Sequence, residues 1–320
     1  MLMSFESTSR LINEGKLLHI AGTESLLKKL PMGKWIGGST EYFMAKDGGK
    51  VSGDLLFVTE FPYKNYFIKA YDASEINQVT NDAFSSGFTI LIIPFDSTVH
   101  KEYAQNAATY ENMFLRNVVG WISGLNLGKQ GQTPITIVGS KAESFTDKAV
   151  ELHILTPEEK TVSVNIINIF EQDTDSPLIE FTEEGFSIKK CRIDGKEVSL
   201  ANYLADNAID TKLPLVGDYS GNDVNISIKS IEDGTVNFYA PVFRGIKYRM
   251  AKAVSDYEGL FNTQISQHND TDVVFSCNCI LNFLYGDLEH KKLNAFSGPI
   301  TFGEIAYQLV NQTLVYVSIV

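Results

Sequence analysis

Three apolar runs follow one another between residues 135 and 170: ITIVGS (135–140), AVELHILT (149–156) and TVSVNIINIF (161–170). Each run is rich in Val, Ile and Thr, the residues that are typical of strands, and turn-forming or charged residues separate the runs. No helical pattern lies between them. Consecutive strands of this kind indicate an α+β protein with mixed, largely antiparallel sheets, because a strict alternation of strands and helices would be expected in an α/β protein.

Toward the N-terminus, strands and helices alternate. FTILIIPF (88–95) reads as a buried strand, and either Asp96 or Ser97 after it can cap a helix. Aromatic residues at helical spacing extend that pattern, so we expect the helix to end around residues 120–124. Leucines at helical spacing between residues 9 and 30 predict two further short helices.

A chain of 320 residues is long for one hydrophobic core, so two domains, or two closely packed halves, are expected. The segment EQDTDSPLIEFTEEG (171–185) is the most acidic and least periodic stretch, and we place the boundary inside it. The predicted lobes are residues 1–175 and 186–320. The resulting prediction is an α+β fold of two lobes, with two mixed, largely antiparallel sheets flanked by helices.

Composition limits the partners and the compartment. The formal net charge of −12, without a dense Lys/Arg cluster, argues against nucleic acid as a partner. No signal-peptide pattern and no apolar run of roughly 20 residues is visible, so we expect a cytoplasmic protein without a membrane partner. Three cysteines, Cys191, Cys277 and Cys279, do not form a disulfide framework.

Two of the cysteines lie where an apolar run ends, in FSCNC (275–279). A zinc site would need a second pair of ligands, and the histidines His268 and His290 flank the run at irregular distances. A redox motif needs two residues between its cysteines, and here only Asn278 intervenes. A nucleophile, Cys277 or the neighbouring Ser276, would need an activating base that the sequence does not identify. Packing of small residues is the structural alternative, and no metal site is predicted.

Two further segments carry polar side chains beside glycine. Gly37-Gly38-Ser39-Thr40 lacks the lysine of a P-loop, yet it presents backbone N–H groups and two hydroxyls, so it is either a plain turn or part of a pocket. Glu304 follows Gly303 and could be a buried carboxylate, a charge in the first turn of a helix, or a solvated side chain. The segment 311–313, Asn-Gln-Thr, either turns the backbone or contacts a ligand.

Taken together, these segments resemble the FIST sensory family, which has an N-terminal and a C-terminal portion. The matching residues are Gly37 to Thr40, Phe275 to Cys277, Gly298 with Phe302 to Ile305, and Asn311 with Thr313. One departure is that the Gly-Arg pair of the family pattern is missing after Ser276-Cys277. The resemblance implies a FIST-N-like lobe (1–175), a FIST-C-like lobe (186–320), and a cytoplasmic sensor of amino acids or related metabolites. It also implies a separate signalling partner, since no output module is fused to the chain.

Some members of that family bind haem, but the scattered histidines predict no haem and no other cofactor here. Our first hypothesis is a binding module that holds a small polar ligand between its two halves. The alternatives are a hydrolase-type enzyme with Cys277 or Ser276 as nucleophile, and a structural or assembly protein. The predicted ligand-binding residues are Trp35, Gly38, Ser39, Thr40, Ser276, Cys277, Asn278, Glu304, Asn311 and Thr313.

Overall fold

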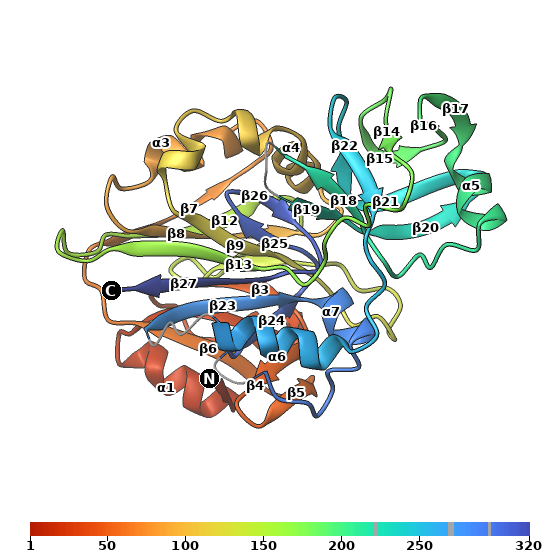
Figure 1. Cartoon of the computed structure of the whole chain (residues 1–320). Coiled ribbons are helices and arrows are strands. Elements are labelled where there is room, and N and C mark those ends of the chain that lie inside the picture. The colour runs from red at the N-terminus through yellow and green to blue at the C-terminus, as the bar shows by residue number, and fades with distance from the viewer. Residues whose placement is uncertain (220–222, 268–271, 294–295) are drawn as a thin grey trace.

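The computed structural model describes residues 1–219, 223–267, 272–293 and 296–320. These residues form a mixed α+β fold with five sheets of several strands, none of them closed. Figure 1 shows a large body and, on the right, a smaller unit made by the segment from β14 to β22. We call residues 179–250 the insert, because the chain returns to the body after them.

The N-terminal sheet has six strands, and β2 and β3 are parallel neighbours within it. Helices α1 (Phe5–Asn13) and α2 (Glu24–Leu27) pack on this sheet through a small apolar cluster that includes Ile12 and Leu27. In order, the strands are β1 (Leu2–Met3), β6 (Leu56–Phe61), β2 (Leu17–Gly22), β3 (Trp35–Ser39), β10 (Thr136–Val138) and β11 (Glu143–Phe145).

The central sheet packs against the N-terminal sheet and combines strands from both ends of the chain. Helices α3 (Val79–Asp82) and α4 (Thr98–Asn106) lie on its upper side in Figure 1, together with the short 3-10 helices η1 (Ile76–Gln78), η2 (Ala107–Thr109) and η3 (Met113–Leu115). In order, its strands are β26 (Gln308–Val310), β25 (Glu304–Ala306), β9 (Val118–Ser123), β8 (Phe88–Pro94), β12 (Ala149–Ile154) and β7 (Tyr66–Tyr71). Strands β8 and β9 are parallel.

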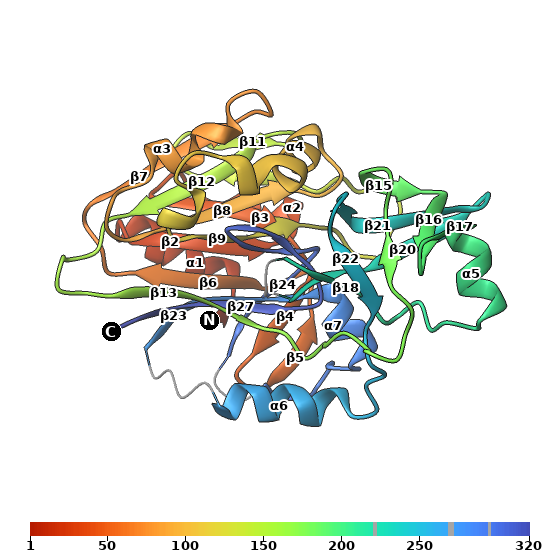
Figure 2. The same ribbon diagram turned by 45° about the horizontal axis from the view of Figure 1, so that its top comes forward.

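The C-terminal sheet also mixes early and late strands. Helix α6 (Tyr257–Gln267) lies along the lower side of the body in Figure 2, and α7 (Ile280–Tyr285) follows directly after β23. In order, the strands are β13 (Val162–Ile167), β27 (Leu314–Ile319), β23 (Val273–Cys279), β24 (Gly298–Thr301), β4 (Tyr42–Ala45) and β5 (Gly48–Val51).

Within the described residues, the strands of the insert pair only with one another. Its larger sheet contains β17 (Lys196–Ser199), β16 (Lys190–Ile193), β14 (Ile179–Glu180), β22 (Lys247–Met250), β18 (Leu215–Asp218) and β19 (Asp223–Ile226). Its smaller sheet contains β15 (Gly185–Ile188), β21 (Thr235–Val242) and β20 (Ile228–Glu232), and α5 (Leu200–Asp206) packs against β21.

The prediction of an α+β class with mostly antiparallel pairing is confirmed, but the prediction of two sheets is wrong, since five are present. A division into two lobes, residues 1–175 and 186–320, is not confirmed. Late strands pair with early ones across that boundary, β24 with β4 and β25 with β9. The body is therefore discontinuous in sequence, and the insert interrupts it.

Two helix predictions are wrong for the same physical reason. LLHIAG (17–22), expected at the end of the first N-terminal helix, is strand β2, buried between β3 and β6. Residues 120–124, expected to end a helix, lie in and after strand β9. A short run that is apolar on every side fits a buried strand and a buried helix equally well. Among the described helices, none is both long and apolar enough to cross a membrane.

Candidate functional site

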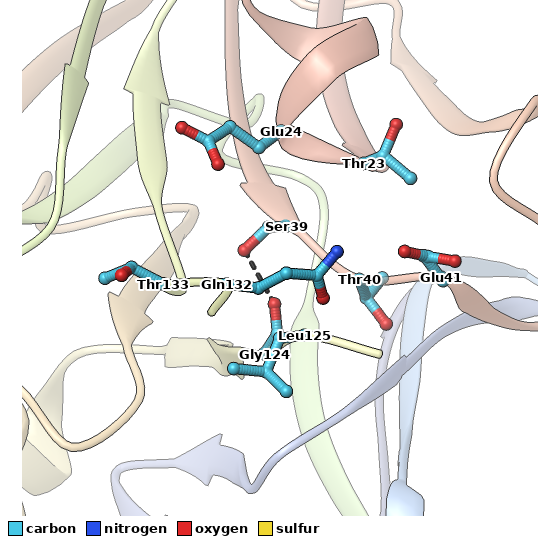
Figure 3. A pocket seen from close by; sticks show the side chains of 9 residues that line it. All are labelled: Thr23, Glu24, Ser39, Thr40, Glu41, Gly124, Leu125, Gln132 and Thr133. Atoms are coloured by element: carbon cyan, nitrogen blue, oxygen red, sulfur yellow. Dashed lines mark hydrogen bonds between the residues drawn. The ribbon is translucent and has the colours of Figure 1, made fainter. Parts of the chain in front are cut away.

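The ends of three strands meet at a small pocket, which we call the strand-end pocket (Figure 3). Thr23 and Glu24 follow β2, Gly124 follows β9, and Ser39 ends β3. The backbone N–H of Gly124 donates to the carbonyl of Ser39 at 2.7 Å, which joins the carboxyl ends of β9 and β3. The hollow has a volume of about 30 Å³. Carboxyl ends of parallel strands are a common place for ligands, because the loops that follow them are free to vary. The lining residues are Thr23, Glu24, Ser39, Thr40, Glu41, Gly124, Leu125, Gln132 and Thr133.

Ser39 was predicted to contact a ligand. It lines the pocket, but its hydroxyl already donates one hydrogen bond and accepts another. Its hydroxyl donates to the carbonyl of Gly124 at 2.7 Å, as Figure 3 shows, and accepts from the N–H of Ile135 at 2.9 Å. The side chain therefore fastens β3 to the loops that follow β9 and precede β10. It shapes the pocket wall and has little left to offer a ligand.

Thr40, the second predicted residue in the wall, links the pocket to the C-terminal sheet. Its hydroxyl donates to the carbonyl of Ile300 in β24 at 2.8 Å and accepts from the N–H of Tyr42 at 3.2 Å. Ile300 directly precedes Thr301, whose hydroxyl belongs to a buried polar network described below. The two groups of residues that the sequence singled out are thus neighbours, joined through this one bond.

Trp35 and Gly38 do not line the strand-end pocket. The indole N–H of Trp35 donates to the carbonyl of Pro31 at 3.0 Å, and the side chain is 1% exposed within the apolar cluster under α1 and α2. A Cβ on Gly38 would lie 2.7 Å from Ile92 and 2.8 Å from Trp121, so glycine permits the close packing of the N-terminal and central sheets. The structure gives both residues packing roles.

Glu41, which the sequence reasoning missed, is the charged group of the pocket. Its side chain is nearly buried, yet its two oxygens lie 2.9 and 2.8 Å from the ammonium nitrogen of Lys129, and Asn126 donates to one of them at 2.8 Å. Burial alone would raise the pKa of this carboxyl, but the contacts with Lys129 and Asn126 outweigh burial and lower it. Glu41 is therefore an anion at neutral pH.

Lys129 reaches Glu41 from the loop that joins β9 and β10. The lysine side chain is 53% exposed, whereas that of Glu41 is 6% exposed. The loop is also held by the N–H of Leu127, which donates to the hydroxyl of Tyr42 at 3.1 Å. The only sequence signal for Glu41 was its position directly after Gly-Gly-Ser-Thr, and Lys129 is 88 residues away.

Glu304 lies in strand β25 and is completely buried, so its interpretation as a first-turn helix residue is wrong. Its two oxygens accept hydrogen bonds from the hydroxyls of Thr301 at 2.7 Å and Thr313 at 2.9 Å. Burial raises the pKa of Glu304 to about 8, although these two hydrogen bonds oppose the shift. The carboxyl is thus mostly protonated at pH 7 and can exchange a proton near neutrality.

The remaining C-terminal candidates surround Glu304. The amide of Asn282 donates to the side-chain oxygen of Asn278 at 2.8 Å and to the carbonyl of Thr313 at 3.1 Å, and the hydroxyl of Tyr257 donates to Asn282 at 2.7 Å. The side-chain nitrogen of Asn278 and the side-chain oxygen of Asn311 are buried without a partner in the described structure. We call Asn278, Asn282, Thr301, Glu304 and Thr313 the buried polar network.

Both cysteines of FSCNC are buried, at 1% exposure each. The thiol of Cys277 donates to the carbonyl of Gly120 at 3.3 Å, and burial, with smaller contributions from Glu304 and Cys279, raises its pKa well above the usual range. A raised pKa disfavours the thiolate that a nucleophile needs. The hydroxyl of Ser276 donates to the carbonyl of Ser297 at 3.0 Å. These residues pack β23 against its neighbours.

The structure therefore separates the ten predicted residues. Ser39 and Thr40 line the strand-end pocket, whereas Asn278, Glu304 and Thr313 form the network behind it. Thr313 also lines a groove of about 690 Å³ between the body and the insert. No group of three or more His, Cys, Asp or Glu side chains among the described residues is placed to hold a metal ion. His268, considered in the sequence as a metal ligand, lies outside the described residues.

A second buried cluster was missed by the sequence reasoning. On β12, the imidazole of His153 contacts the carboxyl of Glu151, and its other nitrogen lies 2.7 Å from the hydroxyl of Thr89 on β8. Burial lowers the pKa of His153 to about 3 and raises that of Glu151 well above its usual range, so both groups are neutral. His153 and Glu151 are both 0% exposed, which suits a structural bond between strands. In AVELHILT (149–156), the two residues stand two positions apart, and this spacing on one face of a strand could have indicated the cluster.

Comparison with protein families decides the relationship. A family model described as a family of unknown function, DUF6976, matches residues 3–320. The chain belongs to the DUF6976 family. A search of curated proteins finds no match.

Membership of DUF6976 overturns the FIST resemblance, since one different family accounts for nearly the whole chain. The short motifs that carried the resemblance consist of glycine, small and polar residues. In this DUF6976 chain several of them have packing roles, as Gly38 and Cys277 illustrate. The expectations of a sensory ligand and of a separate signalling partner lose that basis.

Proposed function

We propose that the strand-end pocket binds a small amine whose ammonium group pairs with Glu41. The observation that carries the proposal is the Glu41–Lys129 pair, in which a nearly buried carboxylate is neutralised by the exposed end of a loop lysine. A ligand ammonium group carries the same charge and the same donors as the lysine side chain. It can therefore replace Lys129 without leaving Glu41 buried and unpaired, which would be costly.

The lining of the pocket favours a cation over an anion. It contains the carboxylates of Glu24 and Glu41, and none of its lining residues is Lys, Arg or His. Lys28 lies 2.5 Å from Glu24 at the exposed outer side of α2. Hydroxyl and amide side chains of Thr23, Gln132 and Thr133 complete the wall and can bond a hydroxyl group on the ligand.

The size of the pocket favours a short molecule. Its volume of about 30 Å³ is room for about two water molecules and lies far below the roughly 300 to 1,000 Å³ that is usual for ligand sites, so only a molecule of a few non-hydrogen atoms suits it. A primary amine with one or two hydroxyl groups fits this combination of volume, charge and hydrogen-bonding groups. Ethanolamine is the simplest probe with these features.

An enzymatic role for Cys277 or Ser276 is less well supported. Neither residue lines the strand-end pocket, the pKa of the Cys277 thiol is raised, and the Ser276 hydroxyl is bonded to a backbone carbonyl. A binding role therefore accounts for more of the geometry than a covalent mechanism does.

A thermal-shift experiment tests the proposal. Ethanolamine should raise the unfolding midpoint with increasing concentration, because a ligand that binds only the folded state stabilises it by mass action. Ethylene glycol, in which a hydroxyl replaces the amine, should not. Glu41→Gln should abolish the shift, whereas Glu60→Gln, which alters the exposed Lys16–Glu60 pair, should retain it. The proposal would be contradicted if ethanolamine and ethylene glycol raised the unfolding midpoint equally, or if ethanolamine raised it equally in Glu41→Gln and Glu60→Gln.

A further inference from the structure

A second hollow lies between the body and the insert, which we call the junction cleft. Its volume is about 280 Å³, close to the lower end of the roughly 300 to 1,000 Å³ that is usual for a small-molecule site. The body contributes the segment after β8 and the start of α4, and the insert contributes parts of β15, β20 and β21. It shares no lining residue with the strand-end pocket.

The imidazole of His100 is the central polar group of the cleft wall. His100 is 3% exposed, and its ring lies between two aromatic rings that also line the cleft, with centroids 5.6 Å from Phe95 of the body and 5.9 Å from Phe186 of the insert. Its backbone N–H donates to the hydroxyl of Ser97, the N-cap of α4, at 3.1 Å. The N-cap bond therefore fixes the backbone of His100 at the helix start.

The hydrogen bonds of His100 assign its tautomer. Nδ1 accepts from the backbone N–H of Asp96 at 3.3 Å, so this nitrogen carries the lone pair. Burial lowers the pKa of His100 to about 4, the nearby Lys101 and Lys229 acting in the same direction and Asp96 against it. The ring is neutral at pH 7, and its single proton is on Nε2. That N–H donor is buried and has no partner among the described residues.

A buried N–H donor without an acceptor is unfavourable, and an oxygen atom from a ligand would satisfy it. The cleft also offers a positive charge. The ammonium nitrogen of Lys229 lies 5.1 Å from the centroid of the Phe95 ring, and Lys229 has no ion pair within the described part of the chain. The other lysine of the cleft, Lys101, is paired with Asp96 at 3.0 Å.

The charges and rings of the lining narrow the class of ligand. Two lysines, Lys101 and Lys229, face two carboxylates, Asp96 and Glu232, so the lining as a whole is neutral and does not suit a polyanion such as a nucleotide. Aromatic side chains supply flat apolar surfaces on both sides of the cleft. They are Phe95, Phe186, Phe238 and Tyr239.

We propose that the junction cleft binds a small aromatic monocarboxylate, whose ring packs against the aromatic side chains of the lining beside His100 and whose carboxylate accepts from Nε2–H of His100 and pairs with Lys229. This site is separate from the amine site and does not depend on it. Because its walls come from the body and the insert, the ligand joins the two parts of the chain.

Calorimetric titration with benzoate tests this site. Benzoate should bind the wild-type chain, and benzamide, which keeps the ring but lacks the charge, should bind at least about tenfold more weakly, as expected when a charge-assisted hydrogen bond is lost. His100→Phe and Lys229→Met should each weaken benzoate binding by about tenfold or more. Lys190→Met is the matched control, since Lys190 is an exposed lysine of the insert paired with Glu197, and it should bind as the wild type does.

A second measurement keeps the test independent of whether these variants fold. In the wild-type chain labelled with 15N-histidine, benzoate should shift the Nε2–H resonance of His100 and leave the Nδ1–H resonance of His19 unchanged, since His19 is buried elsewhere and its Nε2 accepts from the indole N–H of Trp121. Absence of benzoate binding at millimolar concentration would overturn the proposal. So would equal affinity for benzamide, retained affinity in both cleft variants, or an unshifted His100 resonance under saturating benzoate.

Discussion

The ammonium nitrogen of Lys129 lies 2.8 Å from one carboxylate oxygen of Glu41 and 2.9 Å from the other, so an exposed lysine neutralises a nearly buried acid. The two residues come from different strand ends of the body. Their pairing closes the strand-end pocket with a group that can leave it, because the lysine side chain is long and its far end is in water. Two predictions, on stability and on affinity, follow from this arrangement.

Removal of Lys129 should destabilise the fold in a pH-dependent way. In Lys129→Met, the nearly buried Glu41 carboxylate loses its ion-pair partner. We therefore expect the free energy of unfolding at pH 7 to fall by about 1 to 3 kcal/mol. The pKa of Glu41 is lowered in the folded state, so the stabilisation is present above its unfolded pKa and is lost as pH falls through the folded pKa. Urea unfolding at pH 7 and pH 3 measures this. Lys50→Met, which alters the exposed Lys50–Asp47 pair, should change stability by less than about 1 kcal/mol. If Lys129→Met lost as much unfolding free energy at pH 3 as at pH 7, the assignment of Glu41 as the anion paired with Lys129 would be contradicted.

Glu304 should have the opposite pH dependence. Burial raises its folded pKa to about 8, above the unfolded value of 4.5, so the folded chain binds more protons than the unfolded chain between these pH values. The wild type should therefore lose stability, relative to Glu304→Gln, as pH rises from 5 to 8, by on the order of a few kcal/mol. Unfolding curves at several pH values measure the difference. Glu60→Gln, at an exposed position, is the control. A constant difference between the wild type and Glu304→Gln would show that Glu304 does not titrate in this range.

Cys277 should react slowly with iodoacetamide. Its thiol is buried and donates a hydrogen bond to the carbonyl of Gly120, and burial raises the pKa of the thiol. Labelling at pH 7 therefore requires the structure to open. Peptide mass spectrometry should show Cys277 and Cys279 labelled at the rate of global unfolding. Full labelling in urea controls for reagent access. Rapid modification of Cys277 in the folded chain would instead support the nucleophile alternative.

Gly38→Ala should be destabilising although the added methyl group is small. Its Cβ would lie 2.7 Å from Ile92 and 2.8 Å from Trp121, so the two sheets must move apart, at a cost of about 1 to 3 kcal/mol. Gly53→Ala is the matched control, because the nearest atom to its Cβ would be 3.6 Å away. Urea unfolding compares the two variants. If Gly38→Ala and Gly53→Ala were equally stable, the packing role of Gly38 would be contradicted.

The sequence predicted most strands of this fold but not their sheets. AVELHILT (149–156) and FTILIIPF (88–95) are rich in β-branched residues and contain β12 and β8. LLHIAG was misread because a six-residue run that is buried on both faces has no period to reveal. The discontinuous body could not be inferred, since the pairing of β24 with β4 joins segments more than 250 residues apart, as the bond from Thr40 to Ile300 shows.

The site was predictable in its residue types and not in its arrangement. Gly-Gly-Ser-Thr left a plain turn and a pocket role open, because strand ends with small and hydroxyl residues suit both, and Ser39 and Thr40 line the strand-end pocket. Gly38 and Trp35 were assigned to the same wall, yet they lie on opposite faces of β3, where Gly38 packs against the central sheet and Trp35 packs in the apolar cluster under α1 and α2. Lys129 could not be associated with Glu41, since it comes from a distant glycine-rich loop without periodicity.

The affinity of ethanolamine for Lys129→Met tests the central claim most directly. If Lys129 occupies the place of a ligand ammonium group, its removal eliminates an internal competitor, and the apparent dissociation constant should fall by about tenfold relative to the wild type. Calorimetry should therefore show tighter binding to a less stable protein, whereas Glu41→Gln should show no binding. Unchanged or weaker binding to Lys129→Met, with the fold intact, would contradict the assignment of the strand-end pocket as an amine site.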